Sequence, residues 1–256
     1  MKVALLLAYD GTGFSGFARQ RPTVRTVQGE LEERLTTILR APIGITGAGR
    51  TDAGVHAAGQ VVSFDAPDGT DPAWVRARLN RWLGPEIAIR AAAEAPDGFD
   101  ARFSAMRREY DYRVYQSDAP DPFRDRFEVW EPARLTLTTM RAAGRAFVGE
   151  HDFSSFCRRG DGSLVRRVRR VGVTRTGDDL RFEVVADAFC HQQVRSMVGM
   201  LLEVGRGKRA PQDVVAALGA RDRAAAGPVA PARGLHLMRV VYRPDPFASA
   251  TGRRTR

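Results

Sequence analysis

The segment Gly47–Ala57, which reads GAGRTDAGVHA, holds the residues whose types and spacing most suggest chemistry. Its small residues surround Arg50, Asp52 and His56, and glycine lets a backbone approach a ligand closely. A carboxylate in such a loop is accessible, and neighbouring cations keep it ionised. Asp52 is therefore a candidate for a chemical role. The alternatives are that Asp52 only forms an Asx-turn with the backbone and that His56 has a structural role.

Two further side chains stand where an active site could use them. Tyr110 places a hydroxyl near the start of a predicted strand, where the alternative is a core aromatic residue. Arg195 flanks the apolar face of a predicted helix. An arginine there tends to be held over the floor of a cleft, and the alternative is an ordinary surface cation.

The segment Gly149–Cys157 combines serine, histidine, aspartate and cysteine without forming a known catalytic motif. Ser154 does not lie in a nucleophile elbow, and His151 and Asp152 lack the further ligands that a metal needs. We expect Cys157 to pack in the core or to contact a substrate rather than to act as a nucleophile. Glycine motifs of the phosphate-binding loops are missing as well.

Cysteine usage bears on the cellular compartment. Cys157 and Cys190 are the only cysteines, and they lie far apart in the sequence. This spacing excludes a disulfide framework and a zinc site with cysteine ligands. It fits a reducing, cytoplasmic compartment.

Charge and hydropathy narrow the classes of partner. The 256 residues include 40 Lys+Arg against 30 Asp+Glu, a net charge of +10, and all but two of the cations are arginines. Genomic base composition is one cause of such a bias. The other is recognition of nucleic acid, because guanidinium groups bind phosphates in a bidentate manner and stack on bases. No stretch approaches the ~20 apolar residues that span a bilayer, and the apolar start Met1–Ala8 predicts a buried strand rather than a signal peptide.

Hydrophobic periodicity predicts an α+β protein in which two halves position these residues. Helical spacing and strand alternation predict helices at 27–39, 72–83, 138–148 and 193–204 and strands at 3–9, 60–64, 86–92, 109–115, 168–174, 180–187 and 237–242. Each half is similar to a ferredoxin-like or RNA-recognition-like unit, with a largely antiparallel sheet and a cleft between the halves. We place the boundary near 96–108, which gives halves 1–104 and 105–247 and a basic, flexible tail 248–256.

Seven blocks along the chain resemble the tRNA pseudouridine synthase A family, in family order and over nearly the whole length. They are Tyr9–Thr12, Thr26–Glu32, Gly49–Ala57, Ala101–Ala105, Gly149–Phe156, Val194-Arg195 with Val198-Gly199, and Pro231–Leu235. The resemblance implies an isomerase that converts uridine to pseudouridine at positions 38 to 40 of the tRNA anticodon stem-loop. It implies base flipping, no metal or organic cofactor, no membrane, and a homodimer of RNA-recognition-like halves.

The same resemblance implies roles for individual residues. Asp52 matches the essential catalytic carboxylate, Tyr110 the active-site tyrosine and Arg195 the basic residue that pairs with the carboxylate. Arg50 matches the arginine that helps to displace the target base. We assign substrate contacts to Thr51 and His56 beside it. The remaining predicted contacts, to tRNA phosphates, are Arg158, Arg159, Arg166 and Arg167.

The chain departs from the family pattern at three places. Phe17-Ala18 stands where we expect Trp–Gln, Asp100 where we expect His, and Gln193 where the family often has Met. None of these touches the proposed catalytic residues. Asp100 adds a negative charge near a basic surface, which bears on local contacts with the substrate.

Two other functional classes stay open at the level of sequence. One is a non-catalytic RNA-binding protein or RNA chaperone on the same scaffold. The other is a metal- or cysteine-dependent hydrolase that uses His151, Asp152 and Cys157.

Overall fold

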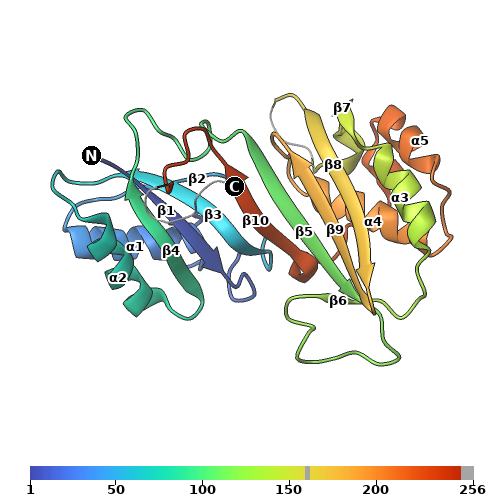
Figure 1. Cartoon of the computed structure of the whole chain (residues 1–256), viewed down its shortest axis with the longest axis horizontal. Coiled ribbons are helices and arrows are strands. Elements are labelled where there is room, and N and C mark those ends of the chain that lie inside the picture. Colours follow the sequence, from blue (N-terminus) through green and yellow to red (C-terminus); the bar gives the residue numbers. More distant parts are fainter. Residues whose placement is uncertain (159–161, 249–256) are drawn as a thin grey trace. The chain divides into compact units, whose positions relative to one another are not determined.

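The computed structural model describes residues 1–158 and 162–248. The chain forms two compact units, whose elements are labelled in Figure 1. The first unit comprises Met1–Met106 together with the chain from Leu237 on, and the second comprises Arg107–His236. Each unit combines helices with a largely antiparallel sheet, which confirms the predicted fold class.

The sheet of the first unit has the strand order β4-β1-β3-β10. β1 lies antiparallel to both β3 and β4, and the short β2 pairs with the end of β3. This is a ferredoxin-like order in which β10 stands beside β3 in the place of an early strand. The bounds of these strands are β1 (Lys2–Tyr9), β2 (Thr46–Gly47), β3 (His56–Asp65), β4 (Ile87–Glu94) and β10 (Leu235–Val241).

Two helices of the first unit, α1 (Val27–Leu39) and α2 (Pro72–Leu83), pack against each other, and α2 also packs on β4 (Figure 1). A capping side chain precedes each of these helices. Thr26 accepts from the backbone N–H of Gly29 at 3.2 Å, and Asp71 accepts from that of Ala73 at 2.9 Å. The buried stripes repeat at intervals of four residues; they are Val27, Leu31 and Leu35 on α1 and Val75, Leu79 and Leu83 on α2.

The sheet of the second unit has the strand order β5-β9-β8-β7, with β6 parallel to the end of β5. β8 and β9, predicted as strands at 168–174 and 180–187, form an antiparallel hairpin. Leu180, Phe182 and Val184 are at most 1% exposed, so this face of β9 packs in the core. The bounds are β5 (Arg107–Tyr115), β6 (Val129–Trp130), β7 (Gly149–Asp152), β8 (Val165–Thr176) and β9 (Asp179–Ala186).

The helices of the second unit cover this sheet. α3 (Leu137–Arg145) contacts β8 and α4 (Gln193–Gly205), and α4 is buried along most of its length. α5 (Asp213–Ala220) packs beside the short 3₁₀ helices η1 (Ser154–Phe156) and η2 (Arg223–Ala226), and η3 (Ala232–Gly234) precedes β10. Among the described residues, no helix is long and apolar enough to cross a membrane.

The division of the chain differs from the expected one in one respect. We expected the last strand to belong to the second half, whereas residues 237–248, which include most of β10, pack with the first unit. At Gly59 of β3, an added Cβ would lie 2.3 Å from the carbonyl oxygen of Met238, so β10 passes close to β3 there. The expected tail 248–256 lies outside the described residues from 249 on.

Candidate active site

Thr51, the residue before Asp52, is fixed by the end of β1. Its Oγ1 lies 2.8 Å from the Tyr9 hydroxyl, and both side chains are buried. Burial raises the pKa of Tyr9 to about 12, so this phenol stays neutral and keeps its proton for hydrogen bonding. The Thr51 carbonyl accepts from the N–H of Phe17 at 3.0 Å. Thr51 is therefore held through both its side chain and its backbone.

The far end of the same loop is held through His56. The N–H of Gly11 donates to His56 Nδ1 at 3.0 Å. Asp10 Oδ1 lies 3.2 Å from the same nitrogen. A Cβ at Gly11 would lie 2.0 Å from the Val55 carbonyl oxygen, a distance that only glycine avoids. Because His56 is 2% exposed, its side chain supports the loop, and direct contact with a substrate stays a prediction.

Phe17 packs against the start of the loop. An added Cβ at Gly47 would lie 2.4 Å from the Phe17 ring, so the backbone at Gly47 rests on this ring. Gly16 has a positive φ of 99°, and a Cβ there would lie 3.0 Å from the Thr51 carbonyl oxygen. The phenylalanine that replaces the expected tryptophan thus fills the space under the start of the loop.

Asp52 is half-buried at the tip of this loop, between the buried Thr51 and Val55. Its backbone carbonyl accepts from the N–H of Val55 at 3.1 Å, which closes a turn that contains Gly54 at φ +75°. Arg50 is exposed beside it. The loop therefore carries a partly accessible Asp52. Contacts with Tyr9, Gly11 and Phe17 fix the backbone of this loop.

Tyr110 belongs to the second unit, where it lies on β5 opposite Val184 of β9. It is 7% exposed, and its ring meets Phe189 edge-on at 5.2 Å between ring centres. The side chain thus has the packing of a core aromatic residue. A role in chemistry through its hydroxyl stays a prediction.

Arg195 stands in the first turn of α4 and is tied to the segment that precedes η3. Its Nε donates to the Ala230 carbonyl at 2.8 Å, and the Ala230 N–H donates to the Arg195 carbonyl at 3.1 Å. A Cβ at Gly199 would lie 2.0 Å from the Pro228 carbonyl oxygen, so α4 packs tightly on this segment. These contacts orient the guanidinium group.

Tyr112 is a neighbour of Arg195 that the sequence did not single out for the site. Its hydroxyl donates to the Pro231 carbonyl at 2.9 Å. Burial raises the pKa of Tyr112, and the positive charge of Arg195 is the largest of the effects that oppose this rise. Tyr112 therefore links β5 to two of the blocks that carry the family resemblance. Asp52 lies in the first unit and Arg195 in the second, and their pairing stays a prediction.

The predicted basic loop is largely a strand, because β8 begins at Val165 and includes Arg166 and Arg167. Arg166 donates to the carbonyls of Ser163 and Val165 at 2.8 and 2.7 Å, whereas Arg167 is exposed. Arg158 is exposed, and its N–H donates to the His191 carbonyl at 3.0 Å. Arg159, also predicted to bind phosphates, lies outside the described residues.

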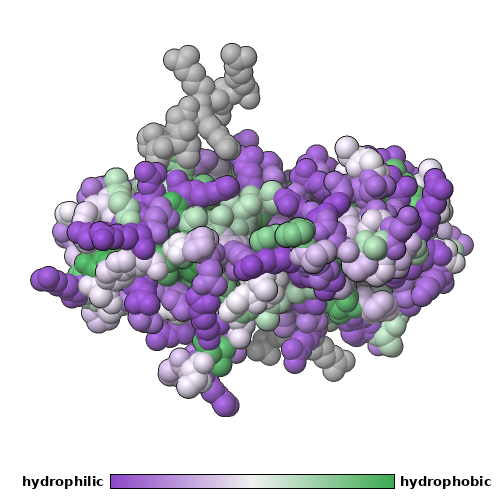
Figure 2. Space-filling view, turned by 90° about the horizontal axis from the view of Figure 1, so that it is seen from below, coloured by the Kyte–Doolittle hydropathy of each residue, from purple (hydrophilic) through white to green (hydrophobic). Residues whose placement is uncertain are grey.

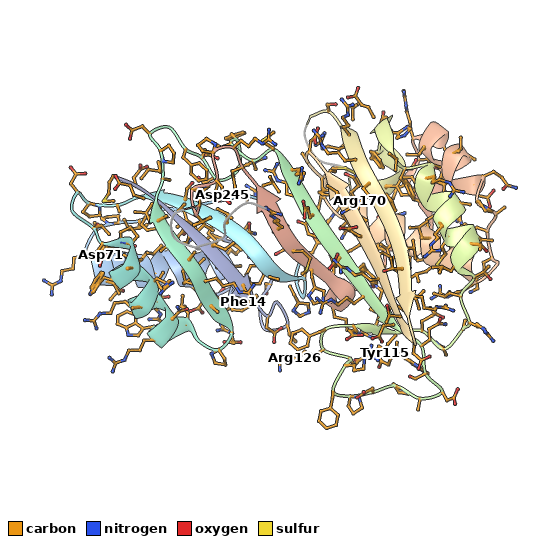
Figure 3. All side chains as sticks on the ribbon, viewed as in Figure 1. Phe14, Asp71, Tyr115, Arg126, Arg170 and Asp245 are labelled. Atoms are coloured by element: carbon orange, nitrogen blue, oxygen red, sulfur yellow. A yellow bond between two sulfur atoms is a disulfide. The ribbon has the colours of Figure 1, made fainter. Side chains whose placement is uncertain are left out.

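A register shift in β8 turns two more arginines outward. The pairing with β9 slips between Val168 and Arg170, so Arg169 is an extra residue. Arg169 pairs with Asp187, and Arg170, labelled in Figure 3, pairs with Glu183. Figure 2 shows a face on which hydrophilic residues predominate and hydrophobic residues form smaller, separate areas.

The two cysteines correct one expectation. We excluded a disulfide framework because Cys157 and Cys190 are distant in the sequence, but the fold brings their Cα atoms to 5.9 Å and they form a disulfide. The bond joins the end of η1 to the segment before α4, where Gln193 Oε1 accepts from the N–H of Cys190 at 3.0 Å. The cysteine count therefore gives no support for a reducing compartment.

The residues of the hydrolase alternative have other partners. Cys157 is buried in the disulfide and has no free thiol. Asp152 accepts from the N–H and the hydroxyl of Ser154, which lowers the pKa of Asp152, and it pairs with Arg221 at 3.2 Å. Across the described ranges, no group of three or more His, Cys, Asp or Glu side chains could hold a metal ion.

Asp100, the other departure from the family pattern, caps a turn. Its Oδ1 accepts from the N–H groups of Arg102 and Phe103 at 2.7 and 2.9 Å. The carboxylate thus stabilises the backbone of the Ala101–Ala105 block. This use of the charge needs no contact with a substrate.

Comparison with known proteins gives the family of the chain. A family model described as tRNA pseudouridine synthase matches residues 6–104 and 143–243. The curated tRNA pseudouridine synthase A of Frankia casuarinae is 47% identical over 100% of this chain and 94% of its own length. The chain belongs to the tRNA pseudouridine synthase A family.

Other members of the tRNA pseudouridine synthase A family show similar agreement. The protein of Geobacillus kaustophilus is 43% identical, over 94% of both chains, and that of Bacillus subtilis is 40% identical, over 94% of this chain and 99% of its own. Among solved structures, a chain of a Cbf5-Nop10-Gar1 complex has 14% identity and a TM-score of 0.34 over 78% of this chain and 54% of that chain, a likeness too slight to carry an argument.

Proteins of the tRNA pseudouridine synthase A family are isomerases that act on RNA, converting uridine to pseudouridine in tRNA. Asp52 and Arg195 lie within the matched residues, and Tyr110 lies between them at 105–142.

Proposed function

We propose that this protein isomerises uridine to pseudouridine at positions 38 to 40 of the tRNA anticodon stem-loop. The observation that carries the proposal is the half-buried Asp52 on a loop braced by Tyr9, Gly11 and Phe17, in a chain of this family. A fixed, partly accessible carboxylate suits attack on a substrate that must be positioned closely.

The reaction breaks the N–C glycosidic bond of the nucleotide and forms a C–C bond between the same uracil and the same sugar. Because nothing is oxidised and no group leaves the nucleotide, the proposal includes no redox or metal cofactor. Asp52 acts by nucleophilic attack or by assisting the loss of uracil from the sugar. Attack on the base, attack on the anomeric carbon and a glycal route all remain compatible with one carboxylate.

The other side chains take supporting roles in this proposal. Arg195 pairs with Asp52 and keeps it ionised and oriented, and Tyr110 stacks on the uracil and relays a proton. Arg50 fills the space that the base leaves when it flips out of the stem-loop. Thr51 and His56 hold the loop, which sets the position of Asp52 at the substrate.

The proposed partners follow from the substrate. Arg158, Arg166 and Arg167 contact tRNA phosphates, with an affinity that falls as salt rises. We propose a homodimer acting in the cytoplasm, the first from the family resemblance and the second from the tRNA substrate. Sedimentation equilibrium would test the dimer.

The deciding experiment compares wild type with Asp52→Ala on unmodified tRNA transcripts. Pseudouridine is mapped by carbodiimide treatment and primer extension, and tRNA binding is measured in parallel. We expect signal at one or more of positions 38 to 40 in wild type, and in Asp52→Ala a loss of at least about a thousandfold with binding kept. Asp97→Ala, which removes an exposed carboxylate from a turn of the same unit, is the matched control.

The outcomes separate the competing classes. Binding without pseudouridine in wild type would favour the RNA-binding protein over the enzyme. Near-normal turnover in Asp52→Ala would remove Asp52 from the chemistry. Activity that disappears with chelator or with Cys157→Ser, while Asp52→Ala stays active, would point to the hydrolase-like set instead.

A further inference from the structure

The outer side of α2 carries two tryptophans that the proposed chemistry does not use. Trp74, Arg78 and Trp82 are spaced four residues apart and so lie along one stripe of the helix. Trp74 is 40% exposed and Trp82 is 44% exposed. The stripe borders the buried face of α2, and Figure 3 shows side chains of this helix projecting away from the strands. We name it the Trp–Arg ridge.

Arginines hold both indole rings of the ridge. The Arg78 guanidinium carbon lies 5.5 Å from the centre of the Trp74 ring, and that of Arg34 on α1 lies 5.9 Å from the Trp82 ring. Each contact is within the range of a cation–π interaction. The rings are therefore positioned on a helix before any partner binds, which reduces the entropy lost on binding.

The charge of the ridge has one sign along the helix. Arg76, Arg78 and Arg81 are exposed, and α2 contains no acidic residue. The acids that flank α2 in the sequence have other partners, since Asp71 caps α2 and Glu86 pairs with Arg25 at 2.7 Å. The ridge thus offers positive charge and partly exposed indole rings together, the combination with which proteins bind unpaired nucleotides.

The packing of α2 in the first unit does not depend on these tryptophans. Val75, Leu79 and Leu83 already bury the helix at 7% exposure or less. Smaller or charged residues at 74 and 82 would leave this packing intact. A protein that exposes two indole rings between arginines therefore presents a binding surface rather than part of the core.

We propose that the Trp–Arg ridge is a second RNA contact, which binds unpaired nucleotides of the tRNA outside the anticodon stem-loop. Trp74 and Trp82 are roughly 12 Å apart along the helix, a length covered by about three to four bases stacked at 3.4 Å. Bases stack on the two indole rings, and Arg78 and Arg81 neutralise the phosphates beside them. This inference rests on the proposed tRNA substrate but not on the proposed catalytic residues.

Kinetics on two substrates of different length test the proposal. The substrates are a full-length tRNA transcript and the isolated anticodon stem-loop of the same tRNA. For Trp74→Ala/Trp82→Ala we expect KM for full-length tRNA to rise roughly tenfold with kcat unchanged, and no change in either constant on the stem-loop. The variant Trp74→Phe/Trp82→Phe keeps an aromatic face and should recover most of the affinity.

Charge variants give a second readout that does not depend on packing. Changing Arg78 and Arg81 to glutamine should lower the slope of log affinity against log salt by about 1.4 to 1.8 for full-length tRNA, at about 0.7–0.9 per phosphate contact. Changing the same residues to lysine should restore the slope. On a Trp130→Phe background, the fluorescence of Trp74 and Trp82 should be quenched by full-length tRNA.

Three results would overturn the inference. The first is an equal rise of KM on both substrates, which would place the defect at the modified stem-loop. The second is an unchanged KM and salt slope in the tryptophan and arginine variants. The third is quenching by polyglutamate at the concentrations at which tRNA quenches, which would mean a general anion site. Because tRNA binding is measured directly, the ridge is tested even if wild type forms no pseudouridine, an outcome that would count against the proposed function alone.

Discussion

The Asp52 loop and the basic strand β8 are held in opposite ways. The loop, residues 47–56, is rich in small side chains and is fixed by buried contacts from the end of β1 and from Phe17. β8 lies in the sheet, and its arginines point outward, two of them paired with acids on the neighbouring strand and segment. The loop thus holds one carboxylate in a fixed position, whereas the strand distributes positive charge over several side chains.

This difference separates two kinds of sensitivity to mutation. At the loop, a shift of about 1 Å is enough to misplace a reacting group and can lower the rate about a hundredfold. On the strand, each arginine adds a similar, salt-dependent increment to binding. Variants at the loop should therefore change kcat, and variants on the strand should change KM.

Among variants that keep Asp52, the largest effect is expected at Gly11, where the loop and β1 meet. Gly11→Ala would place a methyl group 2.0 Å from the Val55 carbonyl oxygen, so the backbone must move. We expect a destabilisation of about 1–3 kcal/mol and a loss of activity of about a hundredfold. Thermal unfolding and steady-state kinetics measure both. Gly44→Ala, with nothing within 4 Å of the added methyl, should be silent, and equal effects at both glycines would contradict the braced loop.

The next largest effect is expected from a substitution that keeps charge. Arg195→Lys loses the planar guanidinium that Nε anchors to the Ala230 carbonyl. We expect kcat to fall about tenfold or more, because a lysine cannot make the same bidentate contact. Arg167→Lys on β8 should be almost as active as wild type. If both lysine variants retain full activity, the proposed pairing of Arg195 with Asp52 is wrong.

A smaller effect is expected at Tyr9, with a characteristic pH dependence. Tyr9→Phe removes the hydrogen bond to Thr51 and should cost about 1 kcal/mol near pH 8. The folded-state pKa of Tyr9, about 12, lies above the unfolded value of 10, so wild type loses stability as pH rises from 10 towards 12. This loss approaches about 2–3 kcal/mol at 1.36 kcal/mol per pKa unit. Denaturant unfolding at pH 8 and pH 11 should show the advantage of wild type disappearing; a constant difference would mean that Tyr9 titrates normally.

The smallest effect is expected on the strand. Arg167→Gln should raise KM for tRNA about threefold at low salt and lower the salt slope by about 0.7–0.9. Arg145→Gln, an exposed arginine on α3, is the control. An effect that persists undiminished at high salt would show that Arg167 does not contact phosphate.

Local signals in the sequence were sufficient to predict most of the helices and strands. α1 was predicted because an apolar repeat at helical spacing, a capping Thr26 and a stop at Pro42 occur together, and α2 was predicted from a helical pattern over 72–83. The β8–β9 hairpin has strict alternation around a turn. α5 was missed because its eight residues, DVVAALGA, give too short a repeat to recognise.

Contacts between distant residues could not be predicted in the same way. The position of Asp52 was predicted from its motif, but the Tyr9–Thr51 bond and the fit of Gly11 under Val55 depend on how β1 meets β3. The disulfide was missed because 33 residues separate Cys157 from Cys190, and only the fold brings them together. Tyr9 and Gly11 were visible as part of a resembling block, which is the signal that could have found them.

The place of β10 has a consequence for the order in which the protein is made. The second unit is continuous in sequence, whereas the first unit stops at Met106 and resumes only at Leu237, within β10 and after the 130 residues of the second unit. At 5–20 residues per second, a ribosome needs on the order of ten seconds to synthesise the intervening segment. During that time the edge of β3 beside Gly59 has no partner, and an unpaired edge invites pairing with other chains. The unit that carries Asp52 is therefore the first to be translated and the last to be completed.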